Sequence, residues 1–272
     1  MAYQGQKFTE PVMCKDGYVV MLPNVNVWGD RIATMPPDPY AESSAQLFPA
    51  GTKLIQGERV WRYTLAGATG LNIAAPLQQA KAIHGEQDDD IVVGAAAAIG
   101  ATAVELTSTA NLAAAPLSTA DGIAEGYLIV NDAAGEGQLY KIRSHDAFVS
   151  TDDSTINLYD ALTIALTTSS QCGLIQNPYR NVIATEAVVS GICVGVPLIA
   201  VTAAYWFWSQ TGGPAPVVVQ AAINLGTEVV VGTTAAKADP AAAATTELCI
   251  GHAMTPGVAD TESCIVFLTL DR

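Results

Sequence analysis

Many short apolar runs, divided by turn-forming residues, are the feature of this 272-residue chain that most constrains its fold. Runs rich in Val, Ile, Thr and aromatic residues alternate with Gly, Pro, Asn and Asp, and in the C-terminal part they follow each other at roughly 8–12 residues. The sequence contains no long amphipathic helical pattern, no heptad run and no repeat of fixed period. We therefore predict an all-β fold of small β-barrel or β-sandwich domains.

Individual strands follow from side-chain alternation and from turn chemistry. Residues 58–65 alternate between two faces, and residues 126–130 and 138–142 form a predicted hairpin through the Gly-rich segment 131–137. Further strands are predicted at 18–22, 155–159, 191–201, 204–210, 217–220, 228–231, 248–250 and 265–270. The segment Thr211–Pro214 is predicted to be a turn. Ala95–Ala98 is compatible with helix or strand, and residues 160–168 with helix or loop.

This pattern divides the chain into three segments. Residues 1–57 are expected to form an extended N-terminal arm, because Met35–Tyr40 contains three prolines and large apolar residues are few. Such an arm can become ordered by adding strands to the sheet of a neighbouring subunit. Residues 58–180 are expected to form a β-rich middle domain, and residues 181–272 a small C-terminal β-barrel or sandwich.

Charge restricts the classes of partner. Only 14% of the residues are charged, against about 25% in typical soluble domains, which favours a subunit of a large assembly. The net charge is −14 and no basic run exists, which argues against binding to nucleic acid. If the chain were a subunit of a shell that encloses DNA, its negative charge would place it on the outside of that shell.

Cysteines and long apolar stretches give no sign of a redox site or a membrane span. The five cysteines are widely spaced without a CxxC pair, so we expect reduced, buried thiols. Residues 187–227 contain no charged side chain, and residues 187–208 are long enough to cross a membrane as a helix. Gly191, Gly195 and Pro197 favour buried strands instead. The first twelve residues lack an apolar core, so no secretory signal is expected.

Reactive side chains do not form a known catalytic pattern. No nucleophile elbow, P-loop, HExxH or GxGxxG pattern is present, and His84, His145 and His252 are each expected at a surface or turn. Asp88–Asp90 is the densest acidic run, expected to be a solvated linker, with a hard-cation site as the alternative. The pair at 152–153 is interpreted in the same way. We expect no enzymatic activity, no cofactor and no metal.

Aromatic residues are the strongest candidates for a binding surface. In Tyr205–Trp208 both faces of a strand would be large and aromatic, so the strand should be covered on both sides. Its cover is either the chain's own core or a neighbouring subunit, and a carbohydrate-stacking platform is a third possibility. The candidate interface residues are Trp61, Tyr63, Tyr205, Trp206, Phe207 and Trp208.

Several of these motifs together resemble virion structural proteins of tailed bacteriophages, many of which are capsid decoration (cement) proteins. They are ERVWRYTLAG at 58–67, GYLIVNDAAGEGQLYKI at 126–142, Asn177-Pro178-Tyr179, VPLIAVTAAYWFWSQTGGP at 196–214, and a C-terminal strand pair that begins at Gly251 and ends with residues 265–270. The resemblance spans residues 55–272 and leaves the arm uncovered.

The resemblance implies a β-rich homotrimer that binds the major capsid protein on the outside of the virion. It implies no catalytic residue. The alternatives are another virion subunit (a tail tube, a head fibre or, less well, the major shell protein) or a glycan-binding surface module. A depolymerase would need a pair of carboxylates in a cleft, and the sequence places no such pair.

Overall fold

The computed structural model describes residues 10–13, 19–22, 37–150, 152–188, 190–242, 248–257 and 260–271. Nearly all of the regular structure in these residues is β-strand, and their one helix, α2 (Glu86–Asp89), is a single turn. The predicted all-β fold is therefore confirmed.

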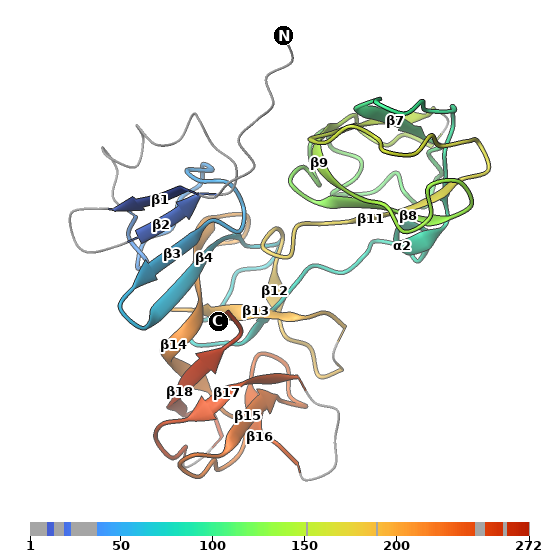
Figure 1. Cartoon of the computed structure of the whole chain (residues 1–272). Coiled ribbons are helices and arrows are strands. Elements are labelled where there is room, and N and C mark those ends of the chain that lie inside the picture. The colour runs from blue at the N-terminus through green and yellow to red at the C-terminus, as the bar shows by residue number, and fades with distance from the viewer. Residues whose placement is uncertain are drawn as a thin grey trace. The chain divides into compact units, whose positions relative to one another are not determined.

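The chain forms two compact units, and the first is discontinuous in sequence (Figure 1). Unit 1 contains residues 1–80 and 178–272, and unit 2 contains residues 81–177. The three consecutive segments expected from the sequence differ from this division, because residues 58–80 group with the C-terminal part. The reason is that strands that precede unit 2 in sequence pair with strands that follow it. β4 (Arg59–Leu65) pairs with β14 (Trp206–Val218), and β5 (Leu77–Gln78) pairs with β12 (Ile183–Ala184).

Unit 1 is built on one large, mainly antiparallel sheet. The strands along its main path follow the order β1-β2-β3-β4-β14-β18-β17-β15-β16, and β5, β12 and β13 join it at β14. The remaining bounds are β1 Glu10–Met13, β2 Val19–Leu22, β3 Lys53–Gln56, β13 Cys193–Pro197, β15 Glu228–Val231, β16 Ala238–Pro240, β17 Cys249–Ala253 and β18 Ser263–Thr269.

The longest strand, β14, corrects the turn predicted at Thr211–Pro214, because the chain runs straight through these residues. The first half of β14 pairs with β4 as far as Gly212, where the register shifts, and the second half pairs with β18. Gly213 has a φ of +77°, and a Cβ there would lie 2.4 Å from the carbonyl oxygen of Glu58. Pro214 lacks an N–H, which is tolerated because β4 no longer pairs with β14 there. The turn-forming residues therefore shift the pairing of a strand and do not reverse it.

Part of the expected N-terminal arm belongs to unit 1. β1, β2 and β3 pair in antiparallel order and continue onto β4 of the same chain. Phe48, Ala50 and Leu54 are buried with Trp61 and Tyr63 in one hydrophobic cluster. The expectation of an arm without a core is therefore wrong for residues 48–57. Residues 1–9, 14–18 and 23–36 of the arm lie outside the described part of the chain.

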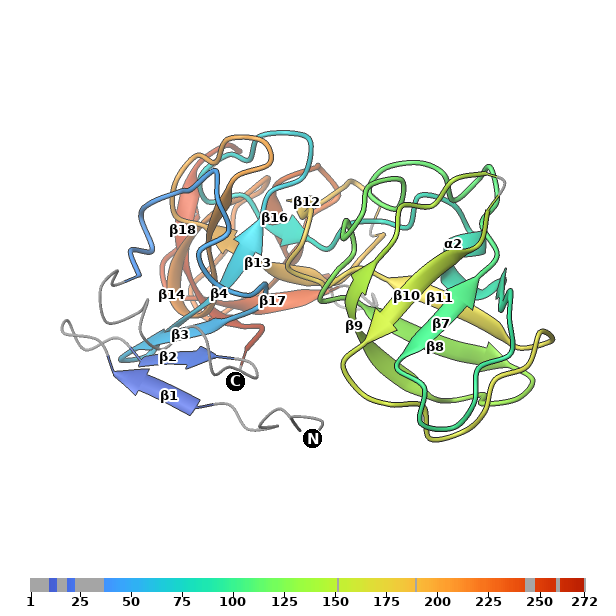
Figure 2. The same ribbon diagram turned by 90° about the horizontal axis from the view of Figure 1, so that it is seen from above.

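Unit 2 is a small six-stranded barrel (Figure 2). Its strands follow the order β6-β11-β8-β9-β10-β7, with bounds β6 Ile91–Val92, β7 Ala103–Leu106, β8 Tyr127–Asp132, β9 Leu139–His145, β10 Ser154–Leu158 and β11 Gln171–Ile175. Its two edges meet where Val93 bridges Leu106 and the amide of Thr107 donates to the carbonyl of Val92 over 2.9 Å. The interior is filled by alternate side chains of the strands, such as Leu128 and Ile142, and by Phe148 from the segment after β9.

The strand predictions for unit 2 agree with the structure. The hairpin of β8 and β9 and the third strand β10 are confirmed. Ala95–Ala98 forms neither a helix nor a named strand, because Gly94 and Ala97 are held by backbone bonds to Glu105 and Leu166. Residues 160–168 form a loop.

Candidate functional site

The six aromatic candidates lie on β4 and at the start of β14, which are neighbouring strands of unit 1. In the register of these strands Trp61 faces Gln210, and Tyr63 faces Trp208. Trp61, Tyr63, Trp206, Phe207 and Trp208 are each at most 5% exposed within the single chain, while Tyr205 is half-buried. The strand is therefore covered on both faces by its own chain, and these five side chains are not available as an exposed subunit interface.

Two separate cores account for the aromatic residues on both faces of β14. On one face, Trp206 stacks on Tyr63 with ring centroids 5.2 Å apart, and Phe48 lies 5.3 Å from Trp208. On the other face, Phe207 joins Leu77 and other aliphatic residues in a second cluster. Burial raises the pKa of Tyr63 to about 12, although the hydrogen bond from the amide of Leu47 to its hydroxyl opposes this rise. The phenol is therefore neutral and structural.

A pocket of about 140 Å³ opens beside the first cluster. Its walls include Tyr63, Trp206 and Trp208, with Asp38 and Glu42 at its polar side. Glu42 is already engaged, because it accepts hydrogen bonds from the amide and the hydroxyl of Thr202 over 2.7 and 2.8 Å. A cavity of about 150 Å³ can hold a benzene-sized group, so the space suits one small apolar group and no sugar chain. The buried tryptophan rings offer no broad stacking platform for a glycan.

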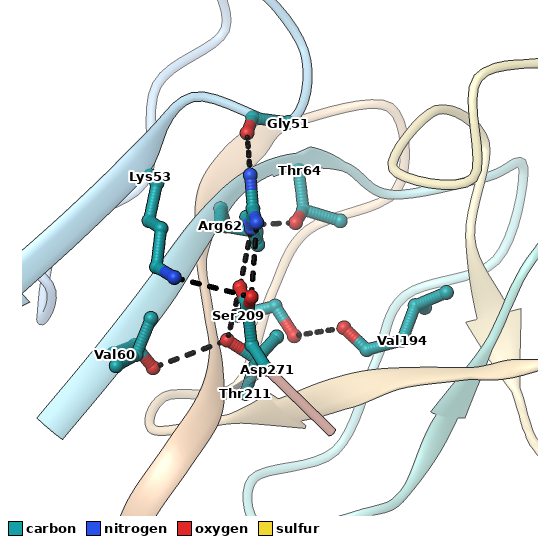
Figure 3. Close-up of polar contacts among 9 residues, drawn as sticks. All are labelled: Gly51, Lys53, Val60, Arg62, Thr64, Val194, Ser209, Thr211 and Asp271. Atoms are coloured by element: carbon teal, nitrogen blue, oxygen red, sulfur yellow. Dashed lines mark hydrogen bonds and ion pairs between the residues drawn. The ribbon is translucent and has the colours of Figure 1, made fainter. Parts of the chain in front are cut away.

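A charged cluster holds the C-terminal end of the chain against β3 and β4 (Figure 3). Arg62 donates two hydrogen bonds to the carboxylate of Asp271, at 2.5 and 3.0 Å, and a third to the carbonyl of Gly51. Lys53 and Thr211 also contact the Asp271 carboxylate, each at 3.3 Å. These contacts occupy both oxygens of the carboxylate, so the cluster is suited to holding strands together and not to proton transfer.

Electrostatics agree with a structural role for this cluster. Burial alone would raise the pKa of Asp271, but the hydrogen bond and charge of Arg62, together with Lys53, hold it below its ordinary value. Burial alone would lower the pKa of Arg62, and its hydrogen bond to Asp271 raises it instead. Both side chains are therefore charged at neutral pH.

The acidic runs remain at the surface of unit 2. Asp88, Asp89 and Asp90 are exposed, while the neighbouring Gln87 is buried and donates to the carbonyl of Leu174 over 2.8 Å. Desolvation and the charge of Asp89 raise the pKa of Asp88. Within the described residues, no group of three or more His, Cys, Asp or Glu side chains is arranged to hold a metal ion.

One histidine differs from the expectation of a surface position. His145 is 3% exposed at the end of β9. Its Nε2 accepts a hydrogen bond from the amide of Ile123 at 3.0 Å, and its Nδ1 lies 2.7 Å from the carbonyl oxygen of Asp146. This pattern fixes the neutral tautomer with the proton on Nδ1, which makes the ring a structural element of the barrel.

The cysteines fit the prediction of structural thiols where they are described. Cys172 and Cys264 are buried, whereas Cys193 and Cys249 are partly buried, and all four are free thiols. Burial raises the pKa of Cys172 to about 12, so its thiol is not nucleophilic near neutral pH. Cys14 lies outside the described residues.

An apolar face on the outside of unit 2 was not predicted. Ile175, Tyr127 and Lys141 lie side by side across β11, β8 and β9, and the amide of Tyr159 donates to the carbonyl of Lys141. In the next row Ile129 faces Leu139, which is 58% exposed. We call this surface the β9 face; it consists of Tyr127, Ile129, Leu139, Lys141, Tyr159 and Ile175. The signal in the sequence is that YLIV (127–130) and QLYKI (138–142) carry large side chains at every position, as a strand with two covered or partly apolar faces does.

A second apolar face lies on the outside of unit 1. Phe267 on β18 is flanked across the sheet by His252 of β17 and Pro214 of β14, and Ile265 is flanked by Pro216. Ile265 and Phe267 are 43% and 41% exposed, and they alternate with the buried Val266. We call this surface the β18 face; it consists of Pro214, Pro216, His252, Met254, Ile265 and Phe267.

The stretch that was long enough to cross a membrane forms β13 and β14, as predicted. Among the described residues there is no helix with the length and apolar character of a membrane span. Comparison with known proteins identified no matching family model, no similar curated protein and no similar solved structure.

Proposed function

We propose that this protein is a structural subunit of a tailed-phage particle. It acts as a decoration protein that binds the major capsid protein on the outer surface of the shell and stabilises the head without catalysis. The sequence motifs that resemble virion structural proteins motivate this proposal. The observation that carries it is the β18 face, an exposed apolar surface on an antiparallel sheet, bordered by Glu228 of β15 opposite His252.

The β18 face has the properties of a docking surface for another protein. Ile265, Phe267 and Met254 are each more than 40% exposed, although they lie on or directly after the two neighbouring strands β17 and β18. Contiguous apolar side chains on a soluble domain mark interaction sites, since their exposure to water is unfavourable. Burying them contributes about 25 cal/mol per Å², which association costs partly offset at each site. Repetition over a closed shell turns many modest contacts into stable attachment.

Binding to shells tests this proposal directly. Shells of the phage that encodes the chain, stripped of it, are mixed with purified protein and sedimented. The wild-type chain should co-sediment and raise the temperature at which the shells rupture. The double variant Ile265→Thr/Phe267→Thr, which keeps β-propensity, should lose most of this binding. Ile99→Thr removes a more exposed apolar side chain from unit 2 and should bind normally.

The outcome that contradicts the proposal is a wild-type chain that stays in the supernatant. Electron microscopy of intact particles separates the decoration role from the other virion roles. Surface knobs on the head support decoration, whereas labelling of stacked rings in the tail would assign the chain to the tail tube.

A further inference from the structure

The charges of unit 2 are distributed unevenly. Between residues 81 and 177 the sequence has thirteen Asp and Glu but only Lys81, Lys141 and Arg143 as cations, so its net charge is −10. Lys141 and Arg143 both point outward from β9, because they alternate with the buried Tyr140 and Ile142. Two of the three cations of an acidic unit therefore lie at or beside the apolar β9 face.

These two cations are not neutralised within the described part of the chain. Neither side chain forms an ion pair or a hydrogen bond with another described residue. Tyr159 lies close enough to Arg143 and Glu125 to experience both charges, and burial, followed by the charge of Glu125, raises its pKa. Exposed Leu139 lies two positions before Lys141 on the same face of β9, and Tyr127 separates Lys141 from the exposed Ile175 across the strands. The β9 face thus combines apolar contact area with unpaired positive charge.

We propose that the β9 face, together with Arg143, binds the acidic end of α2 in a second copy of this chain. Asp88, Asp89 and Asp90 are exposed at this end of α2 and form the densest negative charge in the sequence. Opposite charges across an interface fix its register and speed encounter. Both halves of the contact are therefore present in one sequence, which is what self-association requires.

The charge pattern also restricts the symmetry of this contact. Two β9 faces placed against each other would bring Lys141 and Arg143 opposite their own copies, which like-charge repulsion disfavours. The contact therefore sets the β9 face of one copy against α2 of another. Because the backbone of Asp88 lies beside Gly173 and Ile129, at the border of the β9 face, two copies related by a two-fold axis can make this contact twice. A head-to-tail arrangement would form a ring only where its rotation closes. The inference rests on the proposed function only in taking the chain to be a subunit of an assembly, and it assigns self-association and shell binding to different faces.

Sedimentation velocity of the full-length chain across a wide concentration range tests this contact. The wild type should form a concentration-dependent oligomer that weakens at high salt, because exposed charges are screened. Lys141→Glu/Arg143→Glu should raise the dissociation constant at least about tenfold, since each 1.4 kcal/mol of repulsion corresponds to that factor. Lys237→Glu, a charge reversal in unit 1, should shift it far less. Leu139→Ser should weaken association without changing its salt dependence.

A double-mutant cycle identifies the partner surface. One variant neutralises the cations (Lys141→Gln/Arg143→Gln), and the other neutralises the acidic run (Asp88→Asn/Asp89→Asn/Asp90→Asn). Each variant should weaken association. The combined variant should lose less binding free energy than the sum of the two separate losses. A wild-type chain that is monomeric at every concentration, or a cycle without coupling, overturns the proposal. Failure here is distinguishable from failure of the proposed function. Lys141→Glu/Arg143→Glu should still bind shells through the β18 face, whereas Ile265→Thr/Phe267→Thr should still self-associate.

Discussion

At the scale of single residues, one cluster of charged side chains in unit 1 holds strands together. Asp271 follows β18, the last strand of the chain, and receives Arg62 and Lys53 from two strands that are about 200 residues earlier in sequence. No local pattern predicts such a contact, because a carboxylate near a C-terminus is ordinarily solvated. The cluster explains how a strand from the end of the chain is fixed beside strands from its beginning.

Asp271→Asn should lower the free energy of unfolding of unit 1 by about 1–3 kcal/mol, because a partly buried guanidinium loses its charged partner. The pKa of Asp271 is lowered in the folded chain, so its contribution is complete above the unfolded value of about 4 and is lost as pH falls below it. The variant should therefore lose less stability than the wild type between neutral pH and about pH 3.

Urea unfolding measures both effects, and tryptophan fluorescence reports on unit 1 because residues 81–177 contain no Trp. Asp260→Asn, which breaks an exposed pair with Lys237, is the control and should change little. An equal loss of stability in both variants would show that the contacts of Asp271 with Arg62 and Lys53 do not stabilise unit 1.

At the scale of secondary-structure elements, the sequence predicts strands well and their partners poorly. The alternation in β4 and the turn chemistry between β8 and β9 are local signals, and both are confirmed. The turn predicted at Thr211–Pro214 is wrong because glycine and proline serve equally well in a turn and in a strand whose pairing shifts. The aromatic run at Tyr205–Trp208 correctly indicated a doubly covered strand, but only the register with β4 decides what covers it. The β9 face has a local signal in the hairpin of β8 and β9, whereas the β18 face depends on the pairing of β18 with the distant β14, which a single sequence does not encode locally.

Gly213→Ala tests the interpretation of β14. A Cβ at Gly213 meets a backbone carbonyl at 2.4 Å, and the φ of +77° disfavours any L-residue with a side chain. We expect a loss of at least about 2 kcal/mol in the stability of unit 1, from strain and steric overlap together. Gly57→Ala is the matched control. Gly57 has a φ of +57° but no atom within 4 Å of the place that a methyl group would take, so only the strain of about 1 kcal/mol remains. Equal losses, measured by urea unfolding, would show that the close approach to Glu58 is not important.

At the scale of the whole molecule, unit 2 is an insertion into unit 1. Its 97 residues begin after β5 and end before β12, and these two short strands pair with each other. Each unit has its own buried clusters, so neither depends on the other for a hydrophobic core. In the proposed assembly, the inserted unit presents the β9 face to neighbouring copies and the surrounding unit presents the β18 face to the shell. Two independent cores allow these two contacts to be changed separately, which the experiments on the β9 and β18 faces exploit.

Independent cores predict independent unfolding. Phe148→Ala removes a fully buried ring from unit 2 and should destabilise that unit by about 3–5 kcal/mol. The tryptophan fluorescence midpoint, which reports only on unit 1, should stay at the wild-type value, while calorimetry should show one transition shifted to lower temperature. Leu268→Ala, at a fully packed position of β18, should do the reverse: it should lower the fluorescence midpoint and leave the other transition in place. If either substitution moves both transitions together, the two units unfold as one cooperative body, and the separation of self-association from shell binding would lose its physical basis.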